Sequence, residues 1–97
     1  MNEAGANKLY EAERQGVRQI RGVYADSTGG LCALGVLGGR EKGIAALCRE
    51  YGLVPTDVTC PACGSNWISG GDLIVHLNDD HKLTFSEIAR KLGPDSA

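Results

Sequence analysis

The sequence has little of what marks membrane, secreted or nucleic-acid-binding proteins. No apolar run approaches the length of a membrane span. The formal net charge is −2, so there is no overall basic field to attract nucleic acid or an anionic membrane. The first residues, MNEAGANKLYEAERQG, are polar and charged, unlike a secretory signal. We therefore expect a cytoplasmic protein whose thiols are reduced or bound to metal.

The chain is also short, which limits its core. Its 97 residues suffice for one domain, residues 1–97, small enough for a bound metal to matter for stability. Fourteen glycines indicate many turns and close backbone contacts. The candidate metal ligands are four cysteines and only two histidines.

Two of the cysteines and both histidines lie in one stretch, CPACGSNWISGGDLIVHLNDDH. Two residues separate Cys60 from Cys63, twelve separate Cys63 from His76, and four separate His76 from His81. This spacing is typical of a tetrahedral Cys₂His₂ zinc site. The sequence therefore predicts Zn²⁺ bound by these four residues.

The same stretch resembles the Cys₂His₂ zinc finger, whose small core has an aromatic residue and a leucine at the positions of Trp67 and Leu73. The resemblance implies a ββα unit over residues 57–82. A helix that begins near Gly71 would carry His76. A five-residue separation turns the second histidine about 140° from the first around a regular helix, so we expect the helix to loosen at residues 78–80 for both rings to reach one ion.

Other uses of the cysteines remain open. A Cys₄ zinc or iron–sulfur site would need two further cysteines to converge on the first pair. A nucleophilic pair of Cys32 with His81 is not excluded, although no motif supports it. If one histidine were not a ligand, Asp79 or Asp80 could act as a base. Since four protein ligands leave no position for a reacting water, we expect no enzymatic activity. The Cys₄ alternative comprises Cys32, Cys48, Cys60 and Cys63.

The remaining segments complete an α+β, helix-rich fold, with a short hairpin, the zinc-finger-like unit and a C-terminal helix. Residues 2–15 and 40–51 have helical apolar spacing and end at Gly16 and Gly52. Residues 17–25 favour a strand before the turn DSTGG. The run Thr84-Phe-Ser-Glu87 is a capping box that starts the last helix.

The segment LCALGVLGG, residues 31–39, is compatible with a buried strand or a short helix. Together with the downstream dipeptide Asn78-Asp79, it resembles a group of small uncharacterised bacterial and phage proteins. Those proteins carry a Cys-Ala-x-Gly-Ala segment and an Asn-Asp before their last helix. The resemblance implies a helix over residues 32–37 and transfers no activity.

Nucleic-acid binding is disfavoured by charge and by the residues at the base-reading positions. In zinc fingers bases are read from the start of the helix, at the positions of Ser69, Gly71, Asp72 and Val75, and none of these is Arg, Lys, Asn or Gln. The run HKLTFSEIARKLG does resemble the opening of a helix-turn-helix, so a nucleic-acid-binding regulator is the alternative function.

We expect a small phage or bacterial accessory protein that acts by binding another protein. Two surfaces are candidates, although both have the composition of ordinary solvated surface. One is basic and extends from Arg14 to Arg21. The other is acidic and contains Asp72, Asp79, Asp80 and Glu87.

Overall fold

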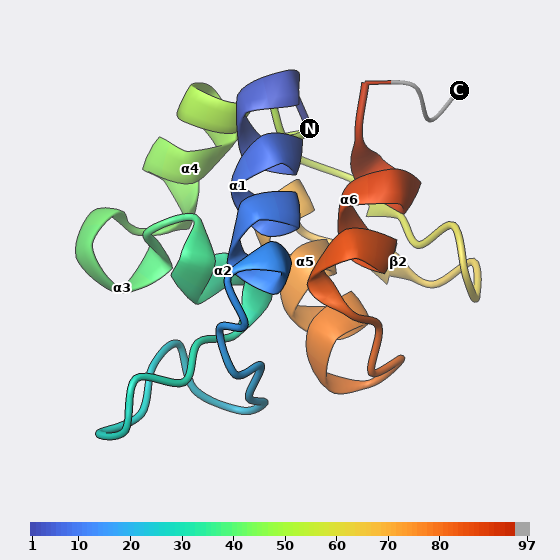
Figure 1. Cartoon of the computed structure of the whole chain (residues 1–97). Helices are drawn as coiled ribbons and strands as arrows, with labels where there is room; N and C mark the ends of the chain where they lie inside the picture. The colour runs from blue at the N-terminus through green and yellow to red at the C-terminus, as the bar shows by residue number, and fades with distance from the viewer. Residues whose placement is uncertain (95–97) are drawn as a thin grey trace.

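A computed structural model describes residues 1–94, in which six helices surround a mainly aliphatic core and one hairpin lies at the edge (Figure 1). The α+β, helix-rich fold with a short hairpin is confirmed. The helices are α1 (Glu3–Arg14), α2 (Ala33–Val36), α3 (Gly39–Lys42), α4 (Ile44–Tyr51), α5 (Gly70–Asp79) and α6 (Phe85–Leu92). The antiparallel strands are β1 (Val58–Thr59) and β2 (Asn66–Trp67).

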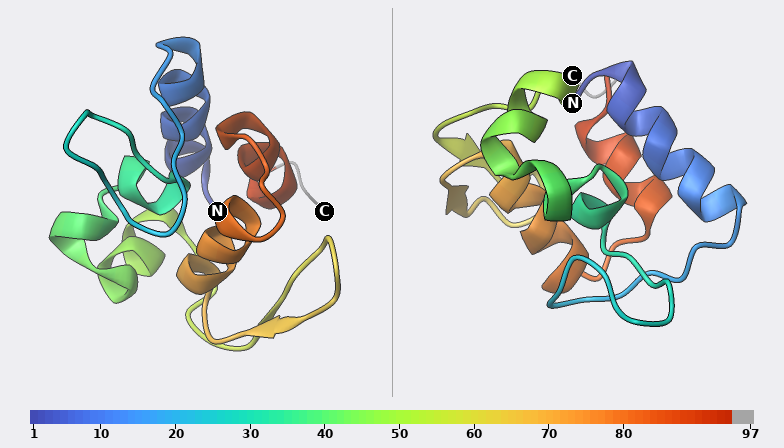
Figure 2. Two further views of the ribbon diagram at one scale, coloured as in Figure 1. Left: turned by 90° about the horizontal axis from the view of Figure 1, so that it is seen from below. Right: turned by 90° about the vertical axis from the view of Figure 1, so that its left-hand side faces the viewer.

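Helices α1 and α6 come from opposite ends of the chain and lie side by side (Figures 1 and 2). Leu9 of α1 and Ile88 of α6 are fully buried, and Leu73 of α5 is nearly so. The amino group of Met1 donates a hydrogen bond to the carbonyl oxygen of Leu92 at the end of α6. Burial of these faces is the main source of stability.

Four of the six helices in residues 1–94 begin at a side chain that caps the backbone, and one of these caps, at Thr84, was predicted. Asn2 caps α1 by accepting from the backbone N–H of Gly5 at 3.0 Å. Thr84 and Glu87 form the predicted capping box of α6. The short helix expected over residues 32–37 is present as α2, and its cap is unusual, because the Sγ of Cys32 accepts from the N–H of Gly35 at 3.3 Å.

The strand predicted over residues 17–25 is wrong. This segment is a loop, whose only β-type pairing among residues 1–94 consists of single bridges from Leu31 to Gln19 and to Ala25. Gly22 has a left-handed φ of 84°, which breaks the extended backbone. Val23 and Tyr24 face solvent, so the segment has no apolar face with which to cover a sheet.

The single helix predicted over residues 40–51 is divided at Gly43. That residue has φ 83° and ψ 160°, a conformation that L side chains rarely adopt, so α3 ends there and α4 starts anew. The predicted end of α4 at Gly52 is confirmed, with φ 65°. The buried positions Leu47, Cys48 and Tyr51 are also as expected.

The side chain of Asn78 connects several elements at the end of α5. Its Oδ1 accepts from Gln19 Nε2 at 2.8 Å and from the backbone N–H of Ala33 at 3.0 Å. Its Nδ2 donates to the carbonyl oxygen of Ile20 and to Asp79 Oδ1, both at 2.8 Å. Asn78 is fully buried and uses the whole hydrogen-bonding capacity of its amide.

The basic surface from Arg14 to Arg21 is engaged within the chain. Arg14 pairs with Glu11 at 2.9 Å, and the Nε of Arg21 donates to the carbonyl oxygen of Asn78 at 3.2 Å. Arg18 pairs with Asp26 at 2.5 Å. These arginines therefore brace α1 and the following loop.

None of the helices in residues 1–94 has the length and apolar character that crossing a bilayer requires.

Replacement of Asn78 by alanine is expected to lower the free energy of unfolding by about 3 kcal/mol, because it leaves several buried polar groups without partners. Urea unfolding followed by circular dichroism measures the change. Asn7→Ala, at an exposed position of α1, is the matched control and should change stability little. Equal stabilities for the two variants would contradict this role for Asn78.

The ion pair of Asp26 gives a pH-dependent expectation. The Arg18 guanidinium, together with the backbone N–H of Gly30 and the hydroxyl of Thr28, holds the pKa of Asp26 well below its usual range. A depressed pKa stabilises the fold above the carboxyl's unfolded pKa, and this contribution fades as the pH falls below about 4. Wild type should therefore be more stable than Asp26→Asn at pH 7. A difference that persists unchanged at pH 3 would contradict the expectation.

Candidate metal centre

The turn that joins β1 to β2 presents the two cysteines. The N–H of Gly64 donates to the carbonyl oxygen of Cys60, and the N–H of Cys60 donates to that of Ser65, both at 2.8 Å. Gly64 has a left-handed φ of 79°, which closes the turn. The backbone nitrogen of Ala62 lies 3.4 Å from the Sγ of Cys60, and its N–H donates a hydrogen bond to that sulfur.

The end of α5 presents the two histidines. His76 lies in the last turn, and the helix loosens after it as expected, because the N–H groups of Asp80 and His81 both donate to the carbonyl oxygen of His76, at 2.9 and 3.2 Å. The second of these spans five residues, a wider turn than an α-helix has. Lys82 then adopts a left-handed φ of 57° and redirects the chain toward α6.

The four predicted ligand residues come together. One ligand atom from each of Cys60, Cys63, His76 and His81 lies within 4.8 Å of all the others. The Nε2 of His76 is 3.4 Å from the Sγ of Cys63, and that of His81 is 3.6 Å from the Sγ of Cys60. Tetrahedral zinc with its usual bond lengths places sulfur and nitrogen ligands about 3.5 Å apart. These two sulfur–nitrogen distances are therefore compatible with a zinc ion, and the four residues could hold a metal.

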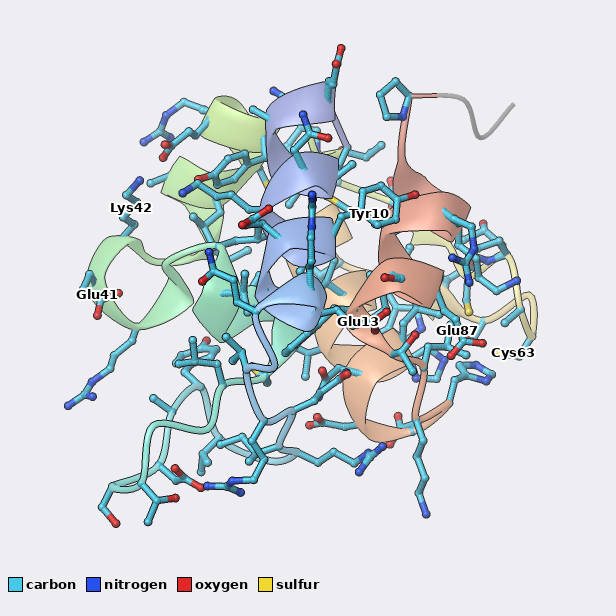
Figure 3. The ribbon with its side chains drawn as sticks, in the orientation of Figure 1. Tyr10, Glu13, Glu41, Lys42, Cys63 and Glu87 are labelled. Atoms are coloured by element: carbon cyan, nitrogen blue, oxygen red, sulfur yellow. The ribbon has the colours of Figure 1, made fainter. Side chains whose placement is uncertain are left out.

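This cluster lies at the edge of the molecule. Figure 3 shows Cys63 on the hairpin side, opposite Glu41 and Lys42 of α3. Cys60 is 1% exposed, whereas Cys63 is exposed. An ion held here would tie the hairpin turn to the end of α5.

Neighbouring side chains orient His76. Its Nδ1 is 2.7 Å from the Oδ2 of Asp80. The carboxylate accepts a hydrogen bond from the Nδ1–H group, which leaves the lone pair of Nε2 free to bind a metal. The indole of Trp67 stacks on the imidazole, with centroids 4.3 Å apart and planes at 29°. Trp67 thus fills the aromatic position that the zinc-finger resemblance implies. Buried Leu73 fills the leucine position.

Ser65 is a functional neighbour that sequence reasoning missed. Its Oγ is 3.1 Å from the Sγ of Cys63 and accepts from the indole N–H of Trp67 at 2.8 Å. The hydroxyl is therefore oriented to donate to the sulfur. The sequence feature that could have indicated this contact is a serine two residues after a predicted ligand cysteine. At this spacing the serine side chain turns back toward the thiol.

The surroundings favour the ionised thiol at Cys63. Hydrogen bonds from the Ser65 hydroxyl and then from His76 lower the pKa of Cys63 to about 5. For His76, burial works to lower the pKa, but contacts with Cys63 and Asp80 outweigh it and the pKa is raised. A thiolate at neutral pH is the form that binds metal.

The other two cysteines lie outside this cluster, so the Cys₄ arrangement is wrong. Cys32 caps α2, and burial raises the pKa of its thiol. The thiol of Cys48 is near the carbonyl oxygen of Val54, at 3.9 Å. His81 contacts Cys60, so a nucleophilic pair of Cys32 with His81 is not formed.

Asp79 and Asp80, the two candidate bases, both form hydrogen bonds within the chain. Asp80 is bound to His76, as described, and Asp79 Oδ2 accepts from the backbone N–H of Gly22 at 3.1 Å. Two of the positions from which zinc fingers read bases, Ser69 and Gly71, are buried at the start of α5.

Comparisons with known proteins give no relatives: no protein-family model, curated protein or solved structure matches the chain.

Loss of the Asp80 carboxylate should weaken metal binding. Asp80→Ala frees the His76 ring and removes the acceptor at Nδ1, so zinc affinity is expected to fall about 10- to 100-fold. Competition with a chromogenic chelator measures the affinity. Glu41→Ala, an exposed carboxylate on α3, is the control and should bind zinc as wild type does. Unchanged affinity in Asp80→Ala would rule out this role.

Proposed function

We propose that the protein binds one Zn²⁺ through Cys60, Cys63, His76 and His81, and that this zinc holds together a domain whose task is to bind another protein. The observation that supports the metal is the convergence of four ligand atoms within 4.8 Å. The ligand set, two thiolates and two imidazoles, is the one that selects zinc.

A structural role fits the local fold. Each strand of the hairpin has only two residues, which is too little pairing to be stable alone. A structural zinc contributes on the order of 10 kcal/mol, comparable with the whole stability of a small domain. Four protein ligands also leave no open position at which zinc could activate water, so we propose a role without catalysis.

Protein binding accounts for the surface better than nucleic-acid binding does. The net charge of −2 and the burial of Ser69 and Gly71 both disfavour reading of DNA by this finger. The helix-turn-helix-like segment is α6, whose Phe85, Ile88 and Ala89 are turned into the core. A nucleic-acid-binding regulator is therefore the weaker alternative.

The origin and compartment belong to the same proposal. The bacterial and phage proteins that the sequence resembles pair a Cys-Ala segment with a later Asn-Asp, and here the two segments meet through the hydrogen bond from Ala33 N–H to Asn78 Oδ1. We accordingly propose a cytoplasmic accessory protein of a phage or bacterium.

Zinc content tests the proposal directly. Elemental analysis of protein purified without added zinc should find one zinc per chain in wild type. The His76→Ala, His81→Ala double variant should lack it and should lose its cooperative thermal unfolding, because the hairpin is then untied from α5.

A second double variant, Cys32→Ser with Cys48→Ala, is the control for loss of two ligand-type residues. It should retain one zinc per chain, because both cysteines lie outside the cluster. Metal-free wild type, or loss of zinc in this control, would overturn the proposed ligand set.

A further inference from the structure

Four large apolar side chains are exposed in residues 1–94. Val23 and Tyr24 come from the loop after α1, Val54 from the connector after α4, and Ile68 from the end of the hairpin. Their exposed fractions are 56%, 36%, 48% and 78%, respectively. Three of them, Val23, Tyr24 and Ile68, line hollows of the surface. Exposed apolar residues gathered in a hollow mark an interaction site more often than scattered residues do.

Two adjoining hollows lie among these residues. The first, of about 630 Å³, is lined by Leu53, Pro55 and Ile68 among others. The second, of about 430 Å³, is lined by Val23, Tyr24 and Val75 among others. Ile44 and Asp72 line both hollows, which therefore form one continuous surface, named here the α4–α5 groove. Figure 2 (right) shows α4, α5 and the hairpin on the side away from α1.

The walls of this groove are fixed by the fold. A Cβ on Gly71 would lie 2.6 Å from the Cγ2 of Ile44, so glycine allows α4 to approach α5 closely. The N–H of Gly70 donates to the carbonyl oxygen of Val54 at 2.7 Å. The N–H of Asp57 donates to the carbonyl oxygen of Ile68 at 3.1 Å, so the backbone flanking the hairpin also positions the most exposed apolar residue among the four.

The charges of the groove select its occupant. Asp72 and Asp79 are seven residues apart on one face of α5, about 10.5 Å, with Val75 between them. Both carboxylates line the second hollow, whereas Arg49 lines the first. The surface complementary to the second hollow is therefore apolar with flanking cations.

Other occupants fit less well. A second copy docked about a two-fold axis would bring its own Asp72 toward this one, because Asp72 lies where the two hollows join, and like charges would meet. An anionic membrane or a nucleic acid would meet the same two carboxylates.

We propose that the α4–α5 groove binds an amphipathic segment of another protein, in which apolar side chains are flanked by lysine or arginine. The apolar side chains occupy the two hollows beside Ile68 and Val23. The cations lie over Asp72 and Asp79. This inference rests on the proposed protein-binding function and names the surface and the partner's chemistry.

Peptide selection tests the inference without a known partner. The probe is a library of random 12-residue peptides displayed on phage, selected on the immobilised, zinc-loaded full chain. The expected result is enrichment of sequences that combine bulky apolar residues with lysine or arginine. Synthetic copies are then titrated by fluorescence polarisation against wild type and variants.

Three single substitutions locate the binding site. Ile68→Ser removes the most exposed apolar side chain and should weaken binding at least about tenfold. Asp72→Asn should weaken it about two- to fivefold and reduce its dependence on salt. Glu41→Gln removes the same charge from α3 and should leave binding unchanged. Circular dichroism establishes that each variant is folded.

Several outcomes would overturn the inference. They are enrichment of no shared pattern, enrichment of acidic peptides, equal binding by Ile68→Ser, and a concentration-dependent dimer that Ile68→Ser abolishes. Zinc content is measured on the same preparations and separates the two proposals. Cationic apolar peptides that bind a metal-free folded chain would support the groove and refute the zinc site. A zinc-loaded chain that selects no such peptide would refute the groove alone.

Discussion

The amide of Asn78 makes four buried hydrogen bonds, and much of the remaining structure depends on them. They fix the loop after α1 through Gln19 and Ile20, and the start of α2 through Ala33. Gln19 in turn accepts from the backbone N–H of Phe85 at 3.1 Å, which ties the same centre to α6. Because a buried amide with missing partners is costly, these contacts favour one arrangement of four segments over looser alternatives.

This polar centre and the metal cluster occupy the same end of α5. Asn78 lies between the two histidines in sequence, so the loosened turn that brings His81 toward the cysteines also carries the amide to the loop and α2. The next two residues have similar roles. Asp79 accepts a hydrogen bond from the backbone of Gly22, and Asp80 orients the ring of His76. One short polar run thereby serves both the core and the metal ligands.

The sequence was informative where a side chain acts through its own spacing or its neighbours in the chain. The convergence of Cys60, Cys63, His76 and His81, the capping box at Thr84 and the helix stop at Gly52 all followed from local chemistry. The contacts of Asn78 join residues up to 59 positions apart, and local propensity described it only as a poor helix former.

The two wrong elements have the same origin. The β-branched residues after α1 have strand propensity. Whether they form a strand depends on an apolar surface for them to pack against, and none covers Val23. The apolar spacing of residues 40–51 is helical throughout, and only the backbone at Gly43 shows where the axis turns. The α4–α5 groove combines residues from several segments that are distant in sequence, so no local pattern indicated it.

The packing of α1 against α6 has a consequence for the order of assembly during synthesis. The four candidate ligand residues lie within 22 consecutive residues, from Cys60 to His81, so they can come together as soon as that stretch leaves the ribosome. Helix α1 is made before α6, which follows it by more than 70 residues, yet the two helices pack on each other. The nascent chain thus carries the uncovered apolar face of α1 until α6 has been made, and in this interval aggregation competes with folding.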